Sequence, residues 1–239
     1  MQKLSTTDYY GALRGVDREP RRSASNQPAS TGKNDTMGSR LILMEVVKAE
    51  IVQCQRCDGM NIHDVTQASP GYGSPESPVV VVGQSLCGKP CMRAQIPFTG
   101  GSGRFLNLGL ERAGLAKSDI FTTNVVHCHP PGNRPSLPHE IKNCRPYLLR
   151  ELDIIQPRLV VGLGKDASAA LRDVYPKADE LPWPFASPRS PTAAGPKLLA
   201  VPHPSWIKWQ PQEEREEYVE SLAGALRWAF KEASRARLR

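Results

Sequence analysis

The sequence predicts an α/β fold: a single three-layer domain in which helices flank a central four-stranded parallel sheet. Two observations support this class. Short, largely apolar runs occur at residues 79–82, 120–126, 159–163 and 198–201, and such runs are typical of strands buried on both faces. Helical patterns separate these runs, and strands that alternate with helices favour parallel pairing.

The N-terminal stretch, residues 1–40, differs in composition from the rest of the chain. It carries scattered Arg, Ser, Pro and Asn and shows no hydrophobic period. We therefore expect a disordered basic tail. A solvated tail is the favoured interpretation, and a basic arm that contacts phosphate is the alternative. The folded domain is expected over residues 41–239.

Apolar spacing predicts helices at residues 41–52, 104–112, 138–155, 166–174 and 213–233. The last of these has an acidic start and a basic end, which suits the helix dipole. One face of it carries Tyr218, Leu222, Ala225 and Ala229. The segment at 176–196 is rich in Pro, Ser and Ala, and this composition predicts a long loop.

Length and charge narrow the class of protein. A chain of 239 residues suits one domain plus a tail, and a net charge of +7 is compatible with a polyanionic partner such as nucleic acid. No apolar run approaches the roughly 18 residues that span a membrane, and the N-terminus lacks the apolar core of a secretory signal. We expect a cytoplasmic protein that does not bind membranes and acts as a monomer.

Four of the six cysteines form a pattern typical of a metal centre. Cys54 and Cys57 make a CxxC pair, Cys128 ends the second predicted strand, and Cys144 lies within a predicted helix. Four thiolates can hold an iron–sulfur cluster or a structural zinc ion, and thiolate count alone does not separate the two. A disulfide framework is disfavoured in a reducing compartment.

The remaining cysteines, Cys87 and Cys91, lie in the turn region after the first strand, and we expect them to be free thiols.

Polar residues stand where three of the predicted strands end. Gln84 and Ser85 follow Gly83 after the first strand, Asn124 lies near the end of the second, and His203 follows the fourth. Ligands of parallel α/β sheets bind outside the carboxyl ends of the strands, so these residues should converge on one site. Taken singly, each has an ordinary structural explanation, such as capping a turn.

The segment at positions 123–134, TNVVHCHPPGNR, resembles the second-strand segment of family-four uracil-DNA glycosylases. The early CxxC pair and the late helical cysteine also match that family in order. In that family the four cysteines hold a [4Fe-4S] cluster, so the resemblance implies that Cys54, Cys57, Cys128 and Cys144 are its ligands. It also implies hydrolysis of the N-glycosidic bond of uracil, or a related deaminated base, in DNA.

The same resemblance implies roles for the residues at the strand ends. His203 matches the histidine that donates a hydrogen bond to the uracil oxygen as charge develops on the departing base. Asn124 matches the asparagine that reads the base edge, and Phe98, in the segment PFTG, matches the phenylalanine that stacks on the base. Gln84 and Ser85 then occupy the first-strand turn that contacts the base and water.

The two residues after the His-Pro-Ser run, Trp206 and Ile207, are the candidates for a wedge that fills the gap left by an extruded base.

One departure from the family pattern bears on catalysis. That family shows GEAPG in the first-strand turn, whereas this chain has Gly83-Gln84-Ser85 and no Asp or Glu between positions 83 and 100. The carboxylate that would position water is therefore missing from its expected place. Two other functions follow as alternatives: a catalytically weak DNA-binding or damage-sensing protein on the same fold, and an iron–sulfur protein of electron transfer.

Overall fold

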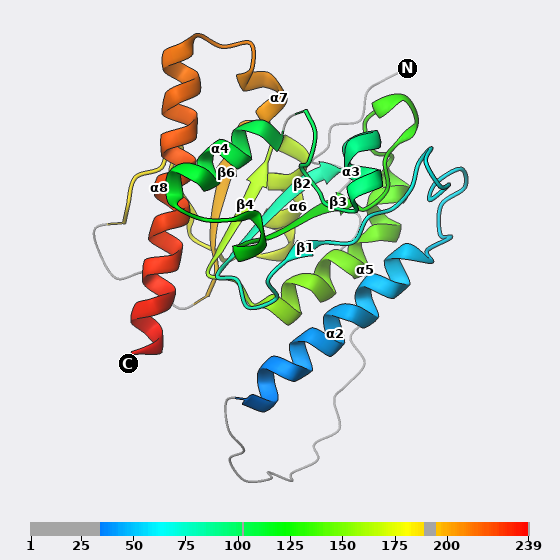
Figure 1. Cartoon of the computed structure of the whole chain (residues 1–239), viewed down its shortest axis with the longest axis horizontal. Coiled ribbons are helices and arrows are strands. Elements are labelled where there is room, and N and C mark those ends of the chain that lie inside the picture. Colours follow the sequence, from blue (N-terminus) through cyan, green and yellow to red (C-terminus); the bar gives the residue numbers. More distant parts are fainter. Residues whose placement is uncertain (1–33, 102, 189–194, 239) are drawn as a thin grey trace.

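The computed structural model describes residues 34–101, 103–188 and 195–238, and its centre is a six-stranded sheet in the order β1-β3-β2-β4-β6-β5 (Figure 1). The four predicted strands are all present and mutually parallel: β2 (Val79–Ser85), β3 (Phe121–Val126), β4 (Leu159–Leu163) and β6 (Lys197–Val201). The predicted α/β class is therefore confirmed.

The sheet has two edge strands that the sequence did not predict. β1 (Tyr72–Gly73) pairs antiparallel with β3, and β5 (Glu180–Leu181) pairs parallel with β6. Each contains only two residues, too few to show the alternation that identifies a strand. β5 lies inside the expected loop at 176–196, so that expectation is wrong at this point; residues 189–194 of the loop lie outside the described residues.

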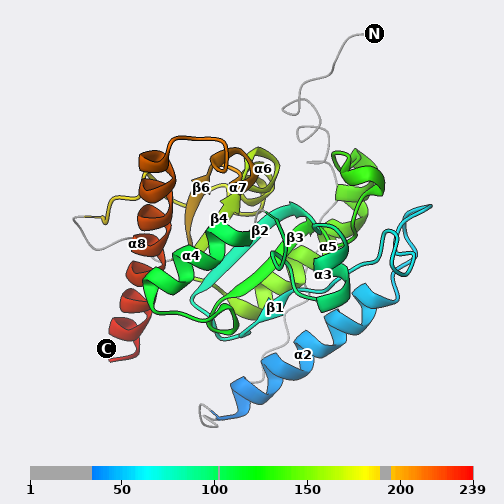
Figure 2. The ribbon, with the colours of Figure 1, turned by 45° about the horizontal axis from the view of Figure 1, so that its top comes forward.

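Helices cover both faces of the sheet (Figures 1 and 2). Alternate side chains of the strands pack against these two helical layers. Val79 and Val81 pack with α4 (Gly103–Ala113) and α8 (Gln212–Arg237). Val80 and Val82 pack against α2 (Asn34–Val52), α5 (Pro138–Ile155) and α6 (Lys165–Val174). The three-layer arrangement that the sequence predicted is therefore confirmed.

The helices agree closely with those predicted, and the four residues expected on one face of α8 are all buried: Tyr218, Leu222, Ala225 and Ala229. α2 begins at Asn34, so residues 34–40, expected in the tail, belong to this helix, and residues 1–33 lie outside the described part. None of the described helices has the length and apolar character needed to cross a membrane.

Four short helical segments lie in the connections between the main elements: α3 (Lys89–Ala94), α7 (Pro204–Ile207), and the 3-10 turns η1 (Lys117–Asp119) and η2 (Pro131–Asn133). α3 follows β2, η2 follows β3 and α7 follows β6, all at the carboxyl ends of parallel strands. These connections surround the site described next.

Candidate active site and cysteine cluster

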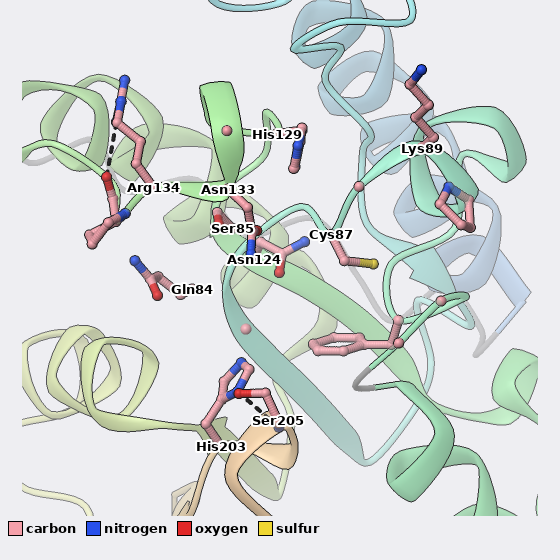
Figure 3. A pocket seen from close by; sticks show the side chains of 18 of the residues that line it. Gln84, Ser85, Cys87, Lys89, Asn124, His129, Asn133, Arg134, His203 and Ser205 are labelled. Carbon is pink, nitrogen blue, oxygen red and sulfur yellow. Dashed lines mark hydrogen bonds between the residues drawn. The ribbon is translucent and has the colours of Figure 1, made fainter. Parts of the chain in front are cut away.

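A pocket of about 900 Å³ lies at the carboxyl ends of the parallel strands (Figure 3). Its lining includes Gln84 and Ser85 from the end of β2, Asn124 from β3, and His203 before α7. Phe98, in the connection between α3 and α4, lines it as well. The structure thus brings to one place the five residues that the sequence assigned to catalysis and base binding.

The floor of the pocket contains a slot that depends on the absence of a side chain at Gly83. Gly83 lies opposite Asn124 in the register of β2 and β3. A Cβ atom on Gly83 would lie 2.5 Å from Asn124 Oδ1 and 2.7 Å from Phe98 Cζ. Only glycine therefore allows the amide and the aromatic ring to lie this close to the strand.

Phe98 has a left-handed backbone, with φ of 59°, which is unusual for a bulky residue. Two neighbours accommodate this conformation, one by a hydrogen bond and the other by having no side chain. Lys117 Nζ donates a hydrogen bond of 2.9 Å to the Phe98 carbonyl, and a Cβ atom on Gly103 would lie 1.7 Å from the same carbonyl oxygen. Strained backbone of this kind concentrates at functional sites because the surrounding structure has to enforce it.

Asn124 is 2% exposed, and its side-chain amide has no hydrogen-bond partner among the residues that the structure describes. An amide offers a carbonyl acceptor and an NH2 donor side by side. Because Asn124 lines the pocket, a ligand edge that carries a complementary donor and acceptor can pair with its amide.

His203 caps the N-terminus of α7, and its partners define which ring nitrogen carries hydrogen. The backbone N–H of Ser205 donates to His203 Nδ1 at 3.1 Å, and the Ser205 hydroxyl lies 2.6 Å from the same nitrogen. Since a backbone N–H can only donate, Nδ1 is the acceptor and Nε2 bears the hydrogen. Burial lowers the pKa of His203 despite the opposing effect of Asp166, which favours this neutral donor form.

Three cations, Lys89, Arg134 and Lys208, also line the pocket, whereas none of the described lining residues is Asp or Glu. Arg134 makes a two-pronged ion pair with the Glu140 carboxylate, at 2.5 and 3.0 Å. The carboxylate missing from the first-strand turn is therefore not supplied from another part of the lining. The sequence analysis did not single out these cations, nor His129, which lines the pocket beside them.

The two residues of the proposed wedge, Trp206 and Ile207, differ in their exposure to solvent. Trp206 is 51% exposed, but Ile207 is 3% exposed and packs in the core beneath α4 and α8, so the expectation of an exposed Ile207 is wrong. The turn of α7 directs successive side chains to different sides, which the sequence reading did not allow for. Trp209, which the sequence analysis missed, is 78% exposed, and Lys208 Nζ lies 4.5 Å from its ring centroid.

Cys87 and Cys91 form a disulfide, so the expectation of two free thiols is wrong. Cys87 precedes α3 and Cys91 lies in its first turn, which brings their Cα atoms to 5.7 Å, a separation typical of disulfides. The bond links the pocket-lining Cys87 to a small buried cluster with Leu86 and Met92.

The other four cysteines are free and lie together away from the pocket. Cys128 and Cys144 are buried, and Cys54 and Cys57 pack against the same apolar cluster between α2, β3 and α5. Burial, together with the nearby Cys144 and Cys54 thiols, raises the pKa of Cys128 to about 12. The amide of Asn143 donates a hydrogen bond of 3.3 Å to Cys57 Sγ.

A buried histidine lies beside these thiols. His127 Nε2 lies 3.2 Å from Glu151, whose carboxylate raises the pKa of His127 to about 10 against the opposing effect of burial. His127 Nδ1 is buried without a hydrogen-bond partner in the described structure. The His127 ring therefore lies between the Glu151 carboxylate and the Cys144 thiol, at the edge of the cysteine cluster.

The described residues contain no group of three or more His, Cys, Asp or Glu side chains that closes around a single metal ion. Zinc draws its thiolates to about 2.3 Å from one point. The four thiols are therefore not arranged around a single point in the part of the chain that the structure describes.

Comparison with known proteins agrees with this geometry. Residues 70–227 match the model of the uracil DNA glycosylase superfamily. A type-4 uracil-DNA glycosylase of Archaeoglobus fulgidus is 30% identical over 183 residues, covering 73% of this chain and 87% of that protein. Type-4 uracil-DNA glycosylases of Sulfurisphaera tokodaii (36% identity; 52% of this chain, 56% of the relative) and Thermotoga maritima (29% identity; 72% and 86%) are also similar.

Proposed function

The chain belongs to the uracil DNA glycosylase superfamily, and from this membership we propose that it is a DNA-repair enzyme that hydrolyses the N-glycosidic bond of uracil in DNA. The observation that carries the proposal is the slot at Gly83, in which a buried amide without a protein partner lies against an aromatic ring. A flat base with a donor and an acceptor on one edge is the ligand that this slot suits.

The reaction requires the base to leave the DNA stack, because the glycosidic bond cannot be reached inside a duplex. In the slot, Phe98 stacks on the base and Asn124 pairs with its edge. The exposed Trp206 fills the gap in the helix, and the extrusion costs a few kcal/mol that these contacts offset.

Bond cleavage places negative charge on the uracil. The Nε2–H of His203 donates a hydrogen bond to the developing charge on the uracil oxygen, and its position is fixed beforehand by Ser205. A donor that is already oriented and neutral stabilises the departing anion without reorganisation of the site. Gln84 lies at the end of β2, in the turn where the carboxylate is missing, and it orients the attacking water.

DNA is the partner in this proposal. Lys89 and Lys208 flank the pocket and contact phosphates, and the backbone amides of the Gly100–Gly101 turn are available for the same purpose. The chain acts as a monomer on this polyanion.

The preferred base is tested by incubating the pure protein with oligonucleotides that carry uracil, hypoxanthine, xanthine or a mismatched thymine, scored for abasic sites. We expect uracil to be excised fastest. Specific binding of uracil DNA with no abasic product from any substrate would instead favour a damage-sensing protein.

A [4Fe-4S] cluster held by Cys54, Cys57, Cys128 and Cys144 is the second part of the proposal. The free state of these thiols and their packing against one apolar cluster support it. When bound, the cluster would link the segment after α2, the segment after β3 and helix α5 through these four cysteines. Protein purified without oxygen should be brown and contain about four irons per chain. A colourless protein with one zinc ion per chain would contradict the cluster.

A further inference from the structure

The position of the Phe98 ring depends on the backbone of the loop between α3 and α4. The φ of Phe98, 59°, lies in the left-handed region, which bulky residues rarely adopt. The direction of the Cα–Cβ bond follows from the backbone conformation, so a change of φ would redirect the ring away from Gly83 and Asn124. The slot therefore requires contacts that hold this backbone in place.

Lys117 contacts the Phe98 backbone from a distant part of the chain. It lies in η1, just before β3, and its Nζ donates a hydrogen bond of 2.9 Å to the Phe98 carbonyl. The other described hydrogen bonds of the backbone at positions 96–101 stay within the loop or come from the start of α4. Lys117 therefore joins the loop that carries Phe98 to the segment that leads into β3, the strand that carries Asn124.

The ammonium of Lys117 is partly buried, and no described carboxylate forms an ion pair with it. Burial lowers the pKa of Lys117, and no charged neighbour offsets this effect. Sheltering a charge that no carboxylate neutralises costs free energy. An apolar side chain of similar length would avoid that cost, so stability alone does not account for a lysine at this position. The hydrogen bond to the Phe98 carbonyl does account for it.

Lys117 does not reach a base in the slot. It is not among the described residues that line the 900 Å³ pocket, whereas Phe98 of the loop is. Lys117 instead lines a separate cavity of about 490 Å³, together with Ile96 and Thr99 of the same loop. An effect of Lys117 on base binding must therefore pass through the loop backbone and the Phe98 ring.

We propose that Lys117 is a positioning residue for base binding: its hydrogen bond to the Phe98 carbonyl keeps the Phe98 ring beside Asn124, where the ring stacks on the extruded base. The inference rests on the proposed glycosylase function. Because the ring is held before the base arrives, binding does not have to order the loop, and the affinity for the base is correspondingly higher.

The test uses Lys117→Met, which keeps a long unbranched side chain and removes the donor. In single-turnover excision with enzyme in excess, the enzyme concentration that gives half the maximal rate should rise about 10-fold, as expected for loss of a hydrogen bond from a charged donor. The maximal rate should change less, because the His203 donor is untouched. Affinity for DNA without uracil should stay at the wild-type value. Lys117→Arg keeps a cationic donor and should restore most of the affinity for uracil DNA.

A double-mutant cycle with Phe98→Ala separates positioning of the ring from a general effect on the fold. Phe98→Ala leaves no ring to position, so adding Lys117→Met to it should cause no further loss. Lys231→Met is the matched control, since Lys231 is an exposed residue of α8 that lines neither cavity. It should leave excision at the wild-type level.

Three outcomes would overturn the role of Lys117 and leave the glycosylase proposal intact. One is a wild-type concentration dependence in Lys117→Met, and another is no recovery in Lys117→Arg. The third is an equal loss from Lys117→Met in the wild-type and Phe98→Ala backgrounds. A wild-type protein that releases no uracil would overturn the glycosylase proposal itself, and the role of Lys117 with it.

Discussion

At the residue scale, the chemistry of the pocket depends on hydrogen positions that backbone contacts determine. The Ser205 N–H occupies Nδ1 of His203 and so makes this histidine a donor to the pocket. A sequence motif identifies a histidine but not its tautomer, because the tautomer depends on what the other ring nitrogen contacts.

The donor role of His203 predicts the size of its contribution. His203→Ala should lower single-turnover uracil excision by about 100- to 1000-fold, the cost typical of removing one oriented donor to a developing anion. Asn124→Ala should reduce the rate and also relax the choice of base, since it removes the edge-reading amide. Gln84→Ala should cost less than either. The rates of the three variants on uracil and hypoxanthine check this order, and a near-wild-type His203→Ala would contradict it.

The slot at Gly83 predicts a loss of activity from adding one methyl group. Gly83→Ala places a Cβ atom 2.5 Å from Asn124 Oδ1 and 2.7 Å from the Phe98 ring, so it should abolish uracil binding while the protein stays folded. Gly224→Ala is the control. Gly224 lies within α8, and its added Cβ atom would meet the Phe185 ring at 3.4 Å, an ordinary van der Waals distance. Binding of uracil DNA and thermal melting are measured for both. Equal activity in the two variants would argue against the slot.

At the scale of elements, α7 combines a catalytic histidine with an exposed aromatic surface. Trp206→Ala should reduce excision from duplex DNA more than from single strands, because a single strand requires less unstacking. Leu149→Ala removes a similarly exposed apolar side chain from α5 and should affect neither substrate. Equal losses on duplex and single-stranded substrates would contradict a wedge role for Trp206.

The start of α5 has a pH dependence that follows from one ion pair. Hydrogen bonding from Arg134 lowers the pKa of Glu140, although burial opposes this, and the Leu137 N–H adds a hydrogen bond of 2.7 Å. A carboxyl whose pKa is lower in the folded state stabilises the fold above its unfolded pKa. That stability is lost as pH falls through the folded pKa.

Glu140→Gln should therefore destabilise the protein at neutral pH and weaken the dependence of stability on pH below about 5. Denaturant unfolding at several pH values measures this effect. Wild type and variant with parallel stability profiles across the acid range would show that the ion pair contributes no pH-dependent stability.

At the scale of the whole molecule, the cysteine cluster joins elements that are far apart in sequence. Cys144→Ser should remove the visible iron–sulfur absorption and lower thermal stability, because metal-binding energy in such a site is also folding energy. Cys87→Ser should retain the iron, since Cys87 lies in the pocket and not in the cluster. Iron content and melting of the two proteins give the comparison, and full iron in Cys144→Ser would exclude it as a ligand.

The buried strands and the long helices could be predicted from the sequence, because the apolar run that begins Val79–Ser85 and the helical spacing of apolar residues are visible within each segment. The two-residue edge strands could not, since pairing with β3 and β6 defines them. Within the site, motif order identified Asn124, Phe98 and His203, which the structure places in one pocket. The left-handed backbone of Phe98, the burial of Ile207 and the disulfide of Cys87 arise from tertiary packing, which no local pattern records.

The central claim is that this pocket breaks the glycosidic bond of uracil, and the most direct measurement is release of free uracil from a uracil-containing oligonucleotide with enzyme in excess. The wild-type protein should release one uracil per oligonucleotide and leave an abasic site, and Gly83→Ala, with its slot closed, should release none. Wild-type protein that binds the oligonucleotide but releases no uracil would contradict the claim. So would a Gly83→Ala variant that releases uracil at the wild-type rate.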